Sequence, residues 1–334
     1  MVDMAMNEMN AKSIADDLAD FLGDHPGQLA RVHSVFPHAV NLLIGEYELI
    51  TLTNQGDIPP MGVLVDRGET FTKLIRTGDE ILLDVDHFRA VSRAFTMDLR
   101  DAETWKTGSM LSIDGRPVAD IARIRLTLIR WLAKQPALGL LPLLPRLARQ
   151  SLDQKPANDN IYSRYIANDL EVFTRAINIS DWECALRLAD RLIGFGIGST
   201  PSCDDFLAAY LVILKIADRL NPGRFPWVPE FNQSIARKAK NRTTLISATM
   251  LRHAADGKIS QIHQQLIQTC LFNNTGELLH FADLVMKHGA TSGGDFLLGL
   301  ICALEWYQSA IMNTEKEGER AWVEPNQPQP LPGI

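Results

Sequence analysis

The stretch GFGIGSTPSCDDF, residues 194–206, stands at the centre of the organisation of this 334-residue chain. Alternating glycines are followed by hydroxyl side chains and a pair of aspartates, after which the apolar run FLAAYLVILKIA begins. A similar arrangement, HGATSGGDFLLG, returns at residues 288–299 and again leads into an apolar run. Because both runs are apolar nearly all round, we predict two central, buried helices, each starting at one of these loops. We call residues 194–201 the first loop and residues 288–291 the second loop.

Each helix start carries the same S-x-x-D pattern. Ser202 precedes Asp205 by three positions, and Ser292 precedes Asp295 by three positions. This spacing is typical of a capping box, in which the serine accepts a hydrogen bond from a helix N–H and the acid reaches back to the cap. Capping would satisfy the free N–H groups of two buried helix starts.

A capping role does not account for the glycines and threonines around the S-x-x-D patterns. Glycine lets the backbone approach a ligand closely, and hydroxyls beside a helix N-terminus favour an anion such as phosphate or carboxylate. Two such starts facing one another would form an anion pocket, so helix capping and ligand binding both stay open. The candidate anion- or substrate-binding residues are Gly196, Gly198, Thr200, Ser202, Asp204, Thr291, Ser292, Gly293 and Arg242.

Catalytic and metal-binding candidates come from the same loops. We expect Asp205, Asp295 and His288 to be the catalytic residues, His288 as an acid or base near neutral pH. Asp204, together with Asp205 and Asp295, is a candidate set of ligands for Mg²⁺ or for a substrate amine. Cys203, at the first position of its helix, is either a nucleophile with a pKa lowered by the helix dipole or a small residue in a tight turn; we favour the second.

The first third of the chain has the texture of a β domain. Residues 1–23 are expected to form an N-terminal arm with an amphipathic helix over about 11–23. Over residues 24–115, short β-branched runs such as AVNLLIG, YELITLT, MGVLVD, TKLI and EILLD are separated by turn residues. This alternation predicts a β-rich domain built as a small barrel or a sandwich.

The rest of the chain has helical periodicity. Residues 116–311 contain segments such as IARIRLTLIRWLAK, WECALRLADRLI and ISQIHQQLIQTCLF, which predict a larger, mostly α-helical domain carrying both loops. Residues 312–334 end in EPNQPQPLPGI and are expected to be a proline-rich, disordered tail. The predicted class is therefore α+β, with a β-rich domain followed by a helical one.

Composition restricts the partners of the chain. The formal net charge is −7, with 33 Lys and Arg against 40 Asp and Glu, which argues against a nucleic-acid binder. The four cysteines form no C-x-x-C pair, and the sequence begins without the basic-then-apolar order of a signal peptide. No apolar stretch is long enough to cross a bilayer. We expect a cytoplasmic protein with no membrane partner.

The first loop resembles the G-x-G-x-G-[apolar]-T-P-S-G-D-D-F-L-x-G motif of a bacterial family labelled as carboxylases, one branch of which is the small partner subunit of oxamate carbamoyltransferase. The second loop is similar to the family's G-x-T-S-G-x-D-x-L-x-G motif, and Thr244 and Ser247 match its T-x-x-S-A segment. The resemblance covers most of residues 30–310. Ser199, Cys203 and Ala209 depart from the pattern, and Cys203 adds a side chain where the family has glycine.

The resemblance implies carbamoyl-transfer chemistry, in which oxalurate and phosphate exchange with oxamate and carbamoyl phosphate. It also implies partners: a small anionic substrate such as carbamoyl phosphate or oxalurate, other carbamoyltransferase subunits, and possible homo-oligomers. Two functions stay open, a catalytic carbamoyltransferase subunit and a non-catalytic subunit that binds a ligand or assembles a complex. Mg²⁺ is the expected cofactor. No G-x-x-x-x-G-K-[ST] or biotin-type motif is present, which disfavours an ATP-using carboxylase.

Overall fold

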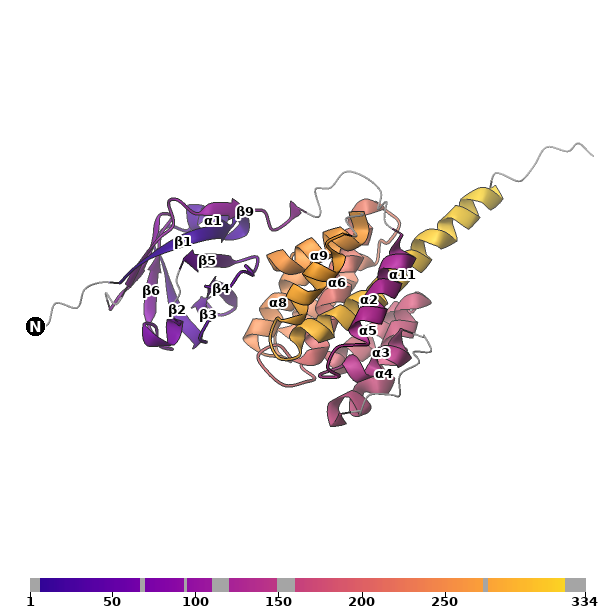
Figure 1. Cartoon of the computed structure of the whole chain (residues 1–334). Coiled ribbons are helices and arrows are strands. Elements are labelled where there is room, and N and C mark those ends of the chain that lie inside the picture. Colours follow the sequence, from indigo (N-terminus) through magenta and orange to yellow (C-terminus); the bar gives the residue numbers. More distant parts are fainter. Residues whose placement is uncertain are drawn as a thin grey trace, which may run out of the picture.

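The computed structural model describes residues 7–66, 70–92, 95–109, 120–148, 160–272 and 276–321, with side chains through residue 311. A β domain precedes a helical domain along the chain, and the two lie side by side (Figure 1). The α+β class predicted from the sequence is confirmed. The expected boundary between residues 115 and 116 lies outside the described residues.

The β domain is a closed barrel. Its strands are β1 (Asn7–Ala15), β2 (Gln28–Val35), β3 (Ala39–Ile44), β4 (Glu48–Thr53), β5 (Gly62–Asp66), β6 (Glu80–Leu83), β7 (His87–Ala90), β8 (Phe95–Asp98) and β9 (Glu103–Trp105). They are arranged in the order β5-β4-β3-β2-β6-β7-β8-β1-β9, and an additional pairing of β5 with β1 closes the ring. Of the two architectures left open by the sequence, the barrel is the observed one, and closure leaves fewer exposed strand edges.

Strand β1 closes the barrel because it pairs on both sides. It runs antiparallel to β5 on one side, and parallel to β8 and then β9 on the other. The predicted helix over residues 11–23 is therefore wrong in its first part: residues 11–15 belong to β1, and helix α1 begins only at Asp16 and ends at Asp24. The run TKLI is also not a strand, since the 3₁₀ turn η1 (Phe71–Lys73) occupies it.

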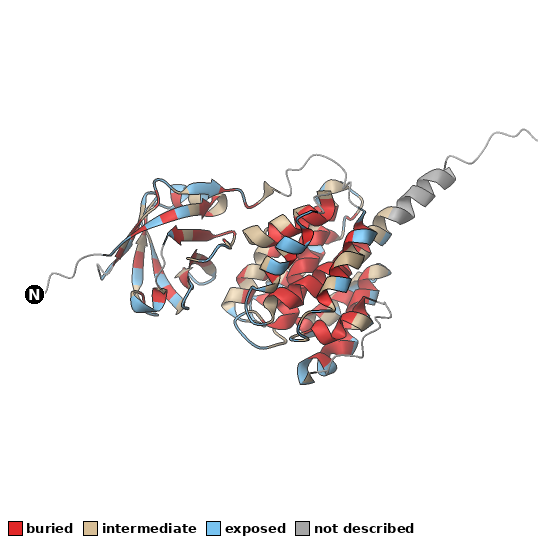
Figure 2. Cartoon of the chain, in the orientation of Figure 1, coloured by how far each residue is buried: buried red, intermediate tan, exposed pale blue. Residues whose placement is uncertain are grey.

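The helical domain is built on two central helices. Its elements are α2 (Ile121–Leu132), η3 (Leu141–Leu143), α3 (Leu144–Leu147), α4 (Ile161–Asn178), α5 (Trp182–Leu192), α6 (Ser202–Leu220), α7 (Val228–Ala239), α8 (Leu245–Ala255), α9 (Gln261–Phe272), α10 (Leu278–Met286) and α11 (Ser292–Ala321). Helices α6 and α11 are the two predicted at the loops; α6 is buried over most of its length, and α11 is buried from Gly293 to Leu304 (Figure 2).

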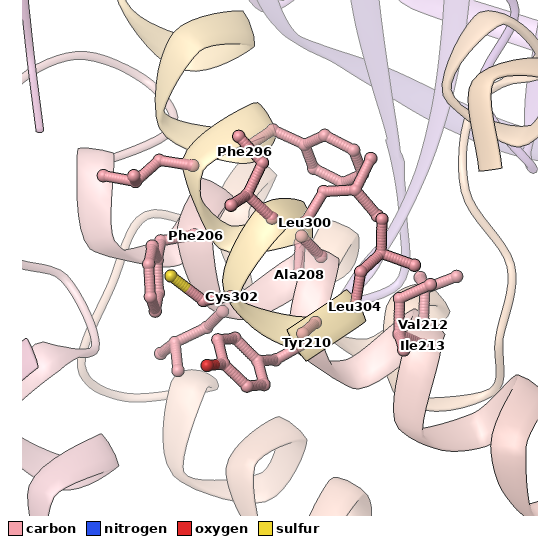
Figure 3. Packing of buried hydrophobic residues seen from close by; sticks show 14 of the residues in the cluster. Phe206, Ala208, Tyr210, Val212, Ile213, Phe296, Leu300, Cys302 and Leu304 are labelled. Carbon is pink, nitrogen blue, oxygen red and sulfur yellow. The ribbon is translucent and has the colours of Figure 1, made fainter. Parts of the chain in front are cut away.

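Helices α6 and α11 pack closely because small residues face large ones at their contact. A Cβ atom at Gly299 of α11 would lie 2.4 Å from the carbonyl oxygen of Phe206 in α6, so only glycine allows this approach. Around the contact, side chains such as Phe206, Tyr210, Phe296 and Leu300 fill the core (Figure 3). The backbones of the two helices therefore touch within two turns of their starts, which brings the loops together.

The C-terminal helix is longer than the sequence predicts. Helix α11 continues to Ala321, so the first part of the segment expected to be a disordered tail is helical. Residues 322–334, which hold the prolines of the tail, lie outside the described residues. No helix in the described ranges is long and apolar enough to cross a bilayer.

The barrel contacts the helical domain through ion pairs and hydrogen bonds. Arg252 of α8 forms a two-pronged pair with Glu48 of β4, with both N···O distances at 2.8 Å. Asp57, between β4 and β5, accepts a hydrogen bond from the backbone N–H of Ile262 at 3.0 Å and so caps the start of α9. Burial would raise the pKa of Glu48, but hydrogen bonds from His253 and Arg252 outweigh burial and lower it to about 2.

Candidate functional site

The first loop is shaped by contacts with protein backbone. Gly194 and Gly196 both have positive φ, at 78° and 132°. A Cβ atom at Gly194 would lie 2.2 Å from the carbonyl oxygen of Arg242, and one at Gly196 would lie 2.3 Å from the backbone nitrogen of Ser202. These two glycines therefore make room for neighbouring chain segments, whereas Gly198 faces open space and is required by its φ of 100°.

The predicted capping box is wrong for α6. The residue that precedes the helix is Pro201, and no side chain caps the helix start. Backbone carbonyls take this role instead: Phe195 accepts from the N–H of Cys203 at 3.0 Å, and Pro201 accepts from that of Asp204 at 2.8 Å. Because the folded-back loop satisfies these N–H groups, the side chains of Ser202 and Asp205 are released for other contacts.

Asp204 joins the first loop to helix α8. Its carboxylate accepts hydrogen bonds from the Gly194 N–H at 2.8 Å, the Thr243 hydroxyl at 2.5 Å and the Ser247 hydroxyl at 2.7 Å. Burial raises the pKa of Asp204, and these three hydrogen bonds oppose the increase. Thr244 adds a second link: its hydroxyl donates to the carbonyl oxygen of Ser199 at 2.5 Å, and it caps α8 by accepting from the N–H of Ser247. Asp204 is thus fully engaged with protein donors.

The two loops meet. The hydroxyl of Thr200 lies 2.9 Å from the hydroxyl of Ser292. Ser292 and Thr200 also act on Asp205 as hydrogen-bond donors, while Ser202 and Thr291 act on Asp295. The two S-x-x-D patterns therefore operate crosswise, with the serine of each helix serving the aspartate of the other.

Each of the two crossed aspartates keeps one unsatisfied oxygen. Oδ2 of Asp205 and Oδ2 of Asp295 are both buried and have no hydrogen-bond partner. Oδ1 of Asp295 is held by the backbone N–H of Leu140 at 2.6 Å. The adjacent Gly139 must be glycine there, because a Cβ atom would lie 2.3 Å from the same carboxylate oxygen. This segment belongs to the site but was not predicted, since it carries no motif.

Burial makes both carboxylates weak acids. Desolvation and the nearby charge of Asp295 raise the pKa of Asp205 well above its usual range, although the Ser292 hydroxyl opposes the increase. Desolvation also raises the pKa of Asp295 to about 6, against the hydrogen bond from Leu140. Both carboxyl groups therefore hold a proton up to a higher pH than an exposed aspartate does.

Cys203 is not an activated thiol. Its side chain is completely buried, and desolvation together with the charge of Asp204 raises the pKa of the thiol well above its usual value. A nucleophilic cysteine needs a lowered pKa and access to substrate. The structure therefore supports the interpretation that Cys203 is not a nucleophile, but it places the residue in the first turn of α6 and not in a tight turn.

His288 lies at the second loop but is directed towards the barrel. Its Nδ1 is 3.4 Å from Oδ2 of Asp57, and its ring meets that of His263 edge to face at 5.4 Å. The hydrogen bond to Asp57 raises the pKa of His288. The contact with Asp57 was not predicted, because residue 57 lies in another domain with no motif around it.

Arg242 is not placed beside the paired carboxylates. Its side chain is half exposed, and its Nε is 3.9 Å from Oδ1 of Asp190 on the surface. Only the backbone of Arg242 borders the first loop, at Gly194. The expected neutralisation of a bound anion by this guanidinium is therefore not seen.

The expected metal ligands are divided by the fold. Across the part of the chain that the structure describes, no group of three or more His, Cys, Asp or Glu is placed to hold a metal ion. Asp204 faces α8, whereas Asp205 and Asp295 face one another's loops. A cation at this position would have two carboxylates at most, together with the surrounding hydroxyls.

These features define a class: a two-domain α+β protein with a closed barrel and a helical domain in which two S-x-x-D helix starts interlock. Family comparisons agree with this description. The sequence-family model for the oxamate carbamoyltransferase subunit AllH matches residues 192–304. The sequence-family model for the AllH family N-terminal domain matches residues 10–104. The chain belongs to the AllH family of oxamate carbamoyltransferase subunits. No solved structure matches it.

Proposed function

We propose that this chain binds a small anionic substrate of carbamoyl transfer, such as oxamate, oxalurate or carbamoyl phosphate, where its two loops meet. The observation that carries the proposal is the pair of buried, unpartnered carboxylate oxygens on Asp205 and Asp295. They lie among hydroxyl groups supplied by both helix starts, which are Thr200, Ser202, Thr291 and Ser292. A natural protein rarely buries unsatisfied polar atoms without a functional reason.

The anionic end of the substrate would be held by hydroxyls and helix dipoles. The positive ends of α6 and α11 converge at the contact between Thr200 and Ser292, which favours a phosphate or carboxylate there. The first N–H groups of α6 are bonded to loop carbonyls, so the ligand would have to draw hydroxyl donors away from Asp205 and Asp295. The negative charge of the substrate would also interact favourably with the positive ends of the two helices, whether or not Mg²⁺ is bound.

In the reaction direction that forms oxamate, a phosphate oxygen attacks the carbamoyl carbon of oxalurate, the C–N bond breaks, and the departing amide nitrogen takes up a proton. A carboxyl group with a raised pKa can donate this proton near neutral pH. Asp205 and Asp295 are the two candidates, since both have a raised pKa. Their site fixes the positions of these groups before the substrate arrives, which lowers the barrier.

A ligand titration of the purified chain tests the binding site. The shift in melting temperature is measured with carbamoyl phosphate, phosphate, oxamate and oxalurate, each with and without Mg²⁺. A ligand at 100 times its Kd adds about 2.7 kcal/mol to the free energy of unfolding. We expect at least one of these ligands to stabilise the wild type and the surface control Asp283→Asn, but not Asp205→Asn. Equal stabilisation of all three proteins, or of none, would contradict the proposed site.

The second candidate function is a non-catalytic binding subunit. It is favoured by the orientation of His288, which faces Asp57 and not the paired carboxylates. The two functions are separated by incubating the purified chain with oxalurate and phosphate and measuring oxamate. Turnover by the chain alone identifies a catalytic subunit, whereas binding of oxalurate without turnover identifies a binding subunit.

A further inference from the structure

The paired carboxylates leave hydrogen-bond acceptors, not donors, without partners. Each of Asp205 and Asp295 has a buried Oδ2 atom with no donor beside it. In the described ranges, no ammonium, guanidinium or imidazole group is paired with either carboxylate; Arg242, the cation predicted from the sequence to serve this site, is paired with Asp190. A ligand that completed this part of the site would therefore have to present N–H or O–H groups.

The groups around the paired carboxylates divide the site into two halves. On one side are the mutually bonded hydroxyls of Thr200 and Ser292, which would turn from Asp205 to donate to an anion. On the other side is Asp295, fixed by the N–H of Leu140 so that its second oxygen remains unsatisfied. A matching ligand carries an anionic group at one end and N–H donors at the other.

The charge state of the pair favours a neutral donor over a dication. Burial raises the pKa of both carboxyl groups, so the pair takes up a proton more readily than two exposed aspartates do. An ionised carboxyl accepts from an amide –NH₂, while a protonated one can donate to the amide oxygen. A carboxamide group carries both of these partners, the –NH₂ donor and the carbonyl acceptor, on one carbon atom.

We propose that Asp205 and Asp295 together bind the terminal carboxamide or carbamoyl –NH₂ group of the substrate. This inference rests on the proposed function and adds what the site recognises: the substrate class is a small acid that carries a –CONH₂ group next to its carboxylate or phosphate. The two aspartates then select the amide, while the hydroxyls bind the charged end. An analogue that has a carboxylate in place of the amide, such as oxalate, is disfavoured at this end by repulsion from the carboxylate pair.

The test compares three ligands of nearly equal size by isothermal titration calorimetry. Oxamate carries the –NH₂ group, oxalate replaces it with –O⁻, and pyruvate replaces it with –CH₃. We expect the wild-type chain to bind oxamate at least tenfold more tightly than oxalate or pyruvate, since a site built for N–H groups rejects analogues that lack them. In Asp205→Asn and Asp295→Asn this preference should fall to less than threefold, and Asp283→Asn should keep it.

The outcomes distinguish this inference from the proposed function. Equal affinity of the wild type for oxamate, oxalate and pyruvate would overturn the recognition of –NH₂ but leave an anion site in place. No binding of oxamate, oxalurate or carbamoyl phosphate would overturn the proposed function itself. The wild-type ligand series needs no variant, so it decides the question even if Asp205→Asn fails to fold.

Discussion

Three aspartates at the two helix starts have the same side chain and different surroundings. Asp204 is surrounded by donors from the first loop and α8. Asp295 has one satisfied oxygen, and Asp205 depends on hydroxyls from across the site. The sequence places Asp204 and Asp205 in the first motif and Asp295 in the second, but only the packing of α6 against α8 and α11 decides which of them is structural. Asp204 is structural, and the other two remain available to a ligand.

Replacing Asp204 should destabilise the fold. Asp204→Asn replaces an acceptor oxygen with an –NH₂ group that faces the donors of Gly194, Thr243 and Ser247. Hydrogen bonds to a charged group contribute about 1.5–3 kcal/mol each, and an unmatched buried donor adds a further cost. We expect a loss of about 2–4 kcal/mol in the free energy of unfolding, measured by urea denaturation. A change below about 0.5 kcal/mol would show that Asp204 does not hold the loop.

The raised pKa of Asp295 predicts a pH dependence of stability. Its pKa rises from 3.8 in the unfolded chain to about 6 in the folded one, so the folded state binds more protons between these values. The contribution of Asp295 to stability is complete below pH 3.8 and is lost as the pH rises through about 6, a difference of about 3 kcal/mol. Urea denaturation at pH 4.5 and 7.5 should show about 2 kcal/mol of this loss in the wild type, because at pH 4.5 most unfolded chains have already released this proton.

The matched comparison is Asp295→Asn, which cannot titrate. Its free energy of unfolding should fall less than that of the wild type between pH 4.5 and 7.5, whatever its absolute stability. Parallel pH profiles for the two proteins would contradict a raised pKa at Asp295.

At the scale of elements, the site exists because two helices can approach closely. Gly299 lets α11 lie against the backbone of α6, and Gly293 similarly lets the start of α11 lie against Val285 at the end of α10. Both helices are apolar nearly all round, as expected from their sequences, and occupy the centre of the core. Close packing at the glycines fixes the distance between the two S-x-x-D patterns.

The glycine at the helix contact can be tested with an internal control. A Cβ atom in Gly299→Ala would lie 2.4 Å from a backbone oxygen of Phe206, which cannot move without shifting α6. We expect a loss of about 1–3 kcal/mol in the free energy of unfolding. Gly23→Ala, in α1, meets nothing within 4 Å and should be neutral or stabilising by up to about 1 kcal/mol. Similar effects of the two substitutions would contradict close packing as the cause.

Most elements could be predicted from the sequence, because their periodicity is strong. The helices at α2, α4, α5, α8, α9 and α10 follow apolar repeats, and β2 to β6 follow β-branched runs. Part of strand β1 was predicted as helix. One of its inward residues, Ala11, is small, and the larger apolar side chains that follow it are spaced as they are in a helix. The capping box of α6 failed because Pro201 and Phe195 supply carbonyls that no short motif records.

At the scale of the molecule, the barrel reaches the second loop. Asp57 of the barrel contacts both His263 and His288 of the helical domain. Burial would raise the pKa of Asp57, but hydrogen bonds from the two histidines outweigh burial and lower it. This contact joins residues far apart in the chain, which is why sequence analysis found His288 without its partner. Gly139 and Leu140 were missed for the same reason.

The contact with Asp57 predicts the titration of His288. NMR titration of the imidazole signals should give His288 a pKa above 6.5 in the wild type, since its hydrogen bond to Asp57 favours the charged form. In Asp57→Asn the pKa should fall to 6.5 or below, because burial and the nearby His263 remain. The exposed control Asp20→Asn should leave it unchanged. A pKa of His288 that is equal in all three proteins would mean that the barrel does not reach the second loop in solution.

The central claim is that the two loops bind the substrate between them, with the paired aspartates at its amide end. A crystal structure of the chain soaked with oxamate tests this claim most directly. We expect the amide nitrogen within about 3 Å of a carboxylate oxygen of Asp205 or Asp295, and the ligand carboxylate against the hydroxyls of Thr200 and Ser292. Oxamate bound elsewhere, or an unchanged site in which the two aspartates bond only to each other, would contradict it.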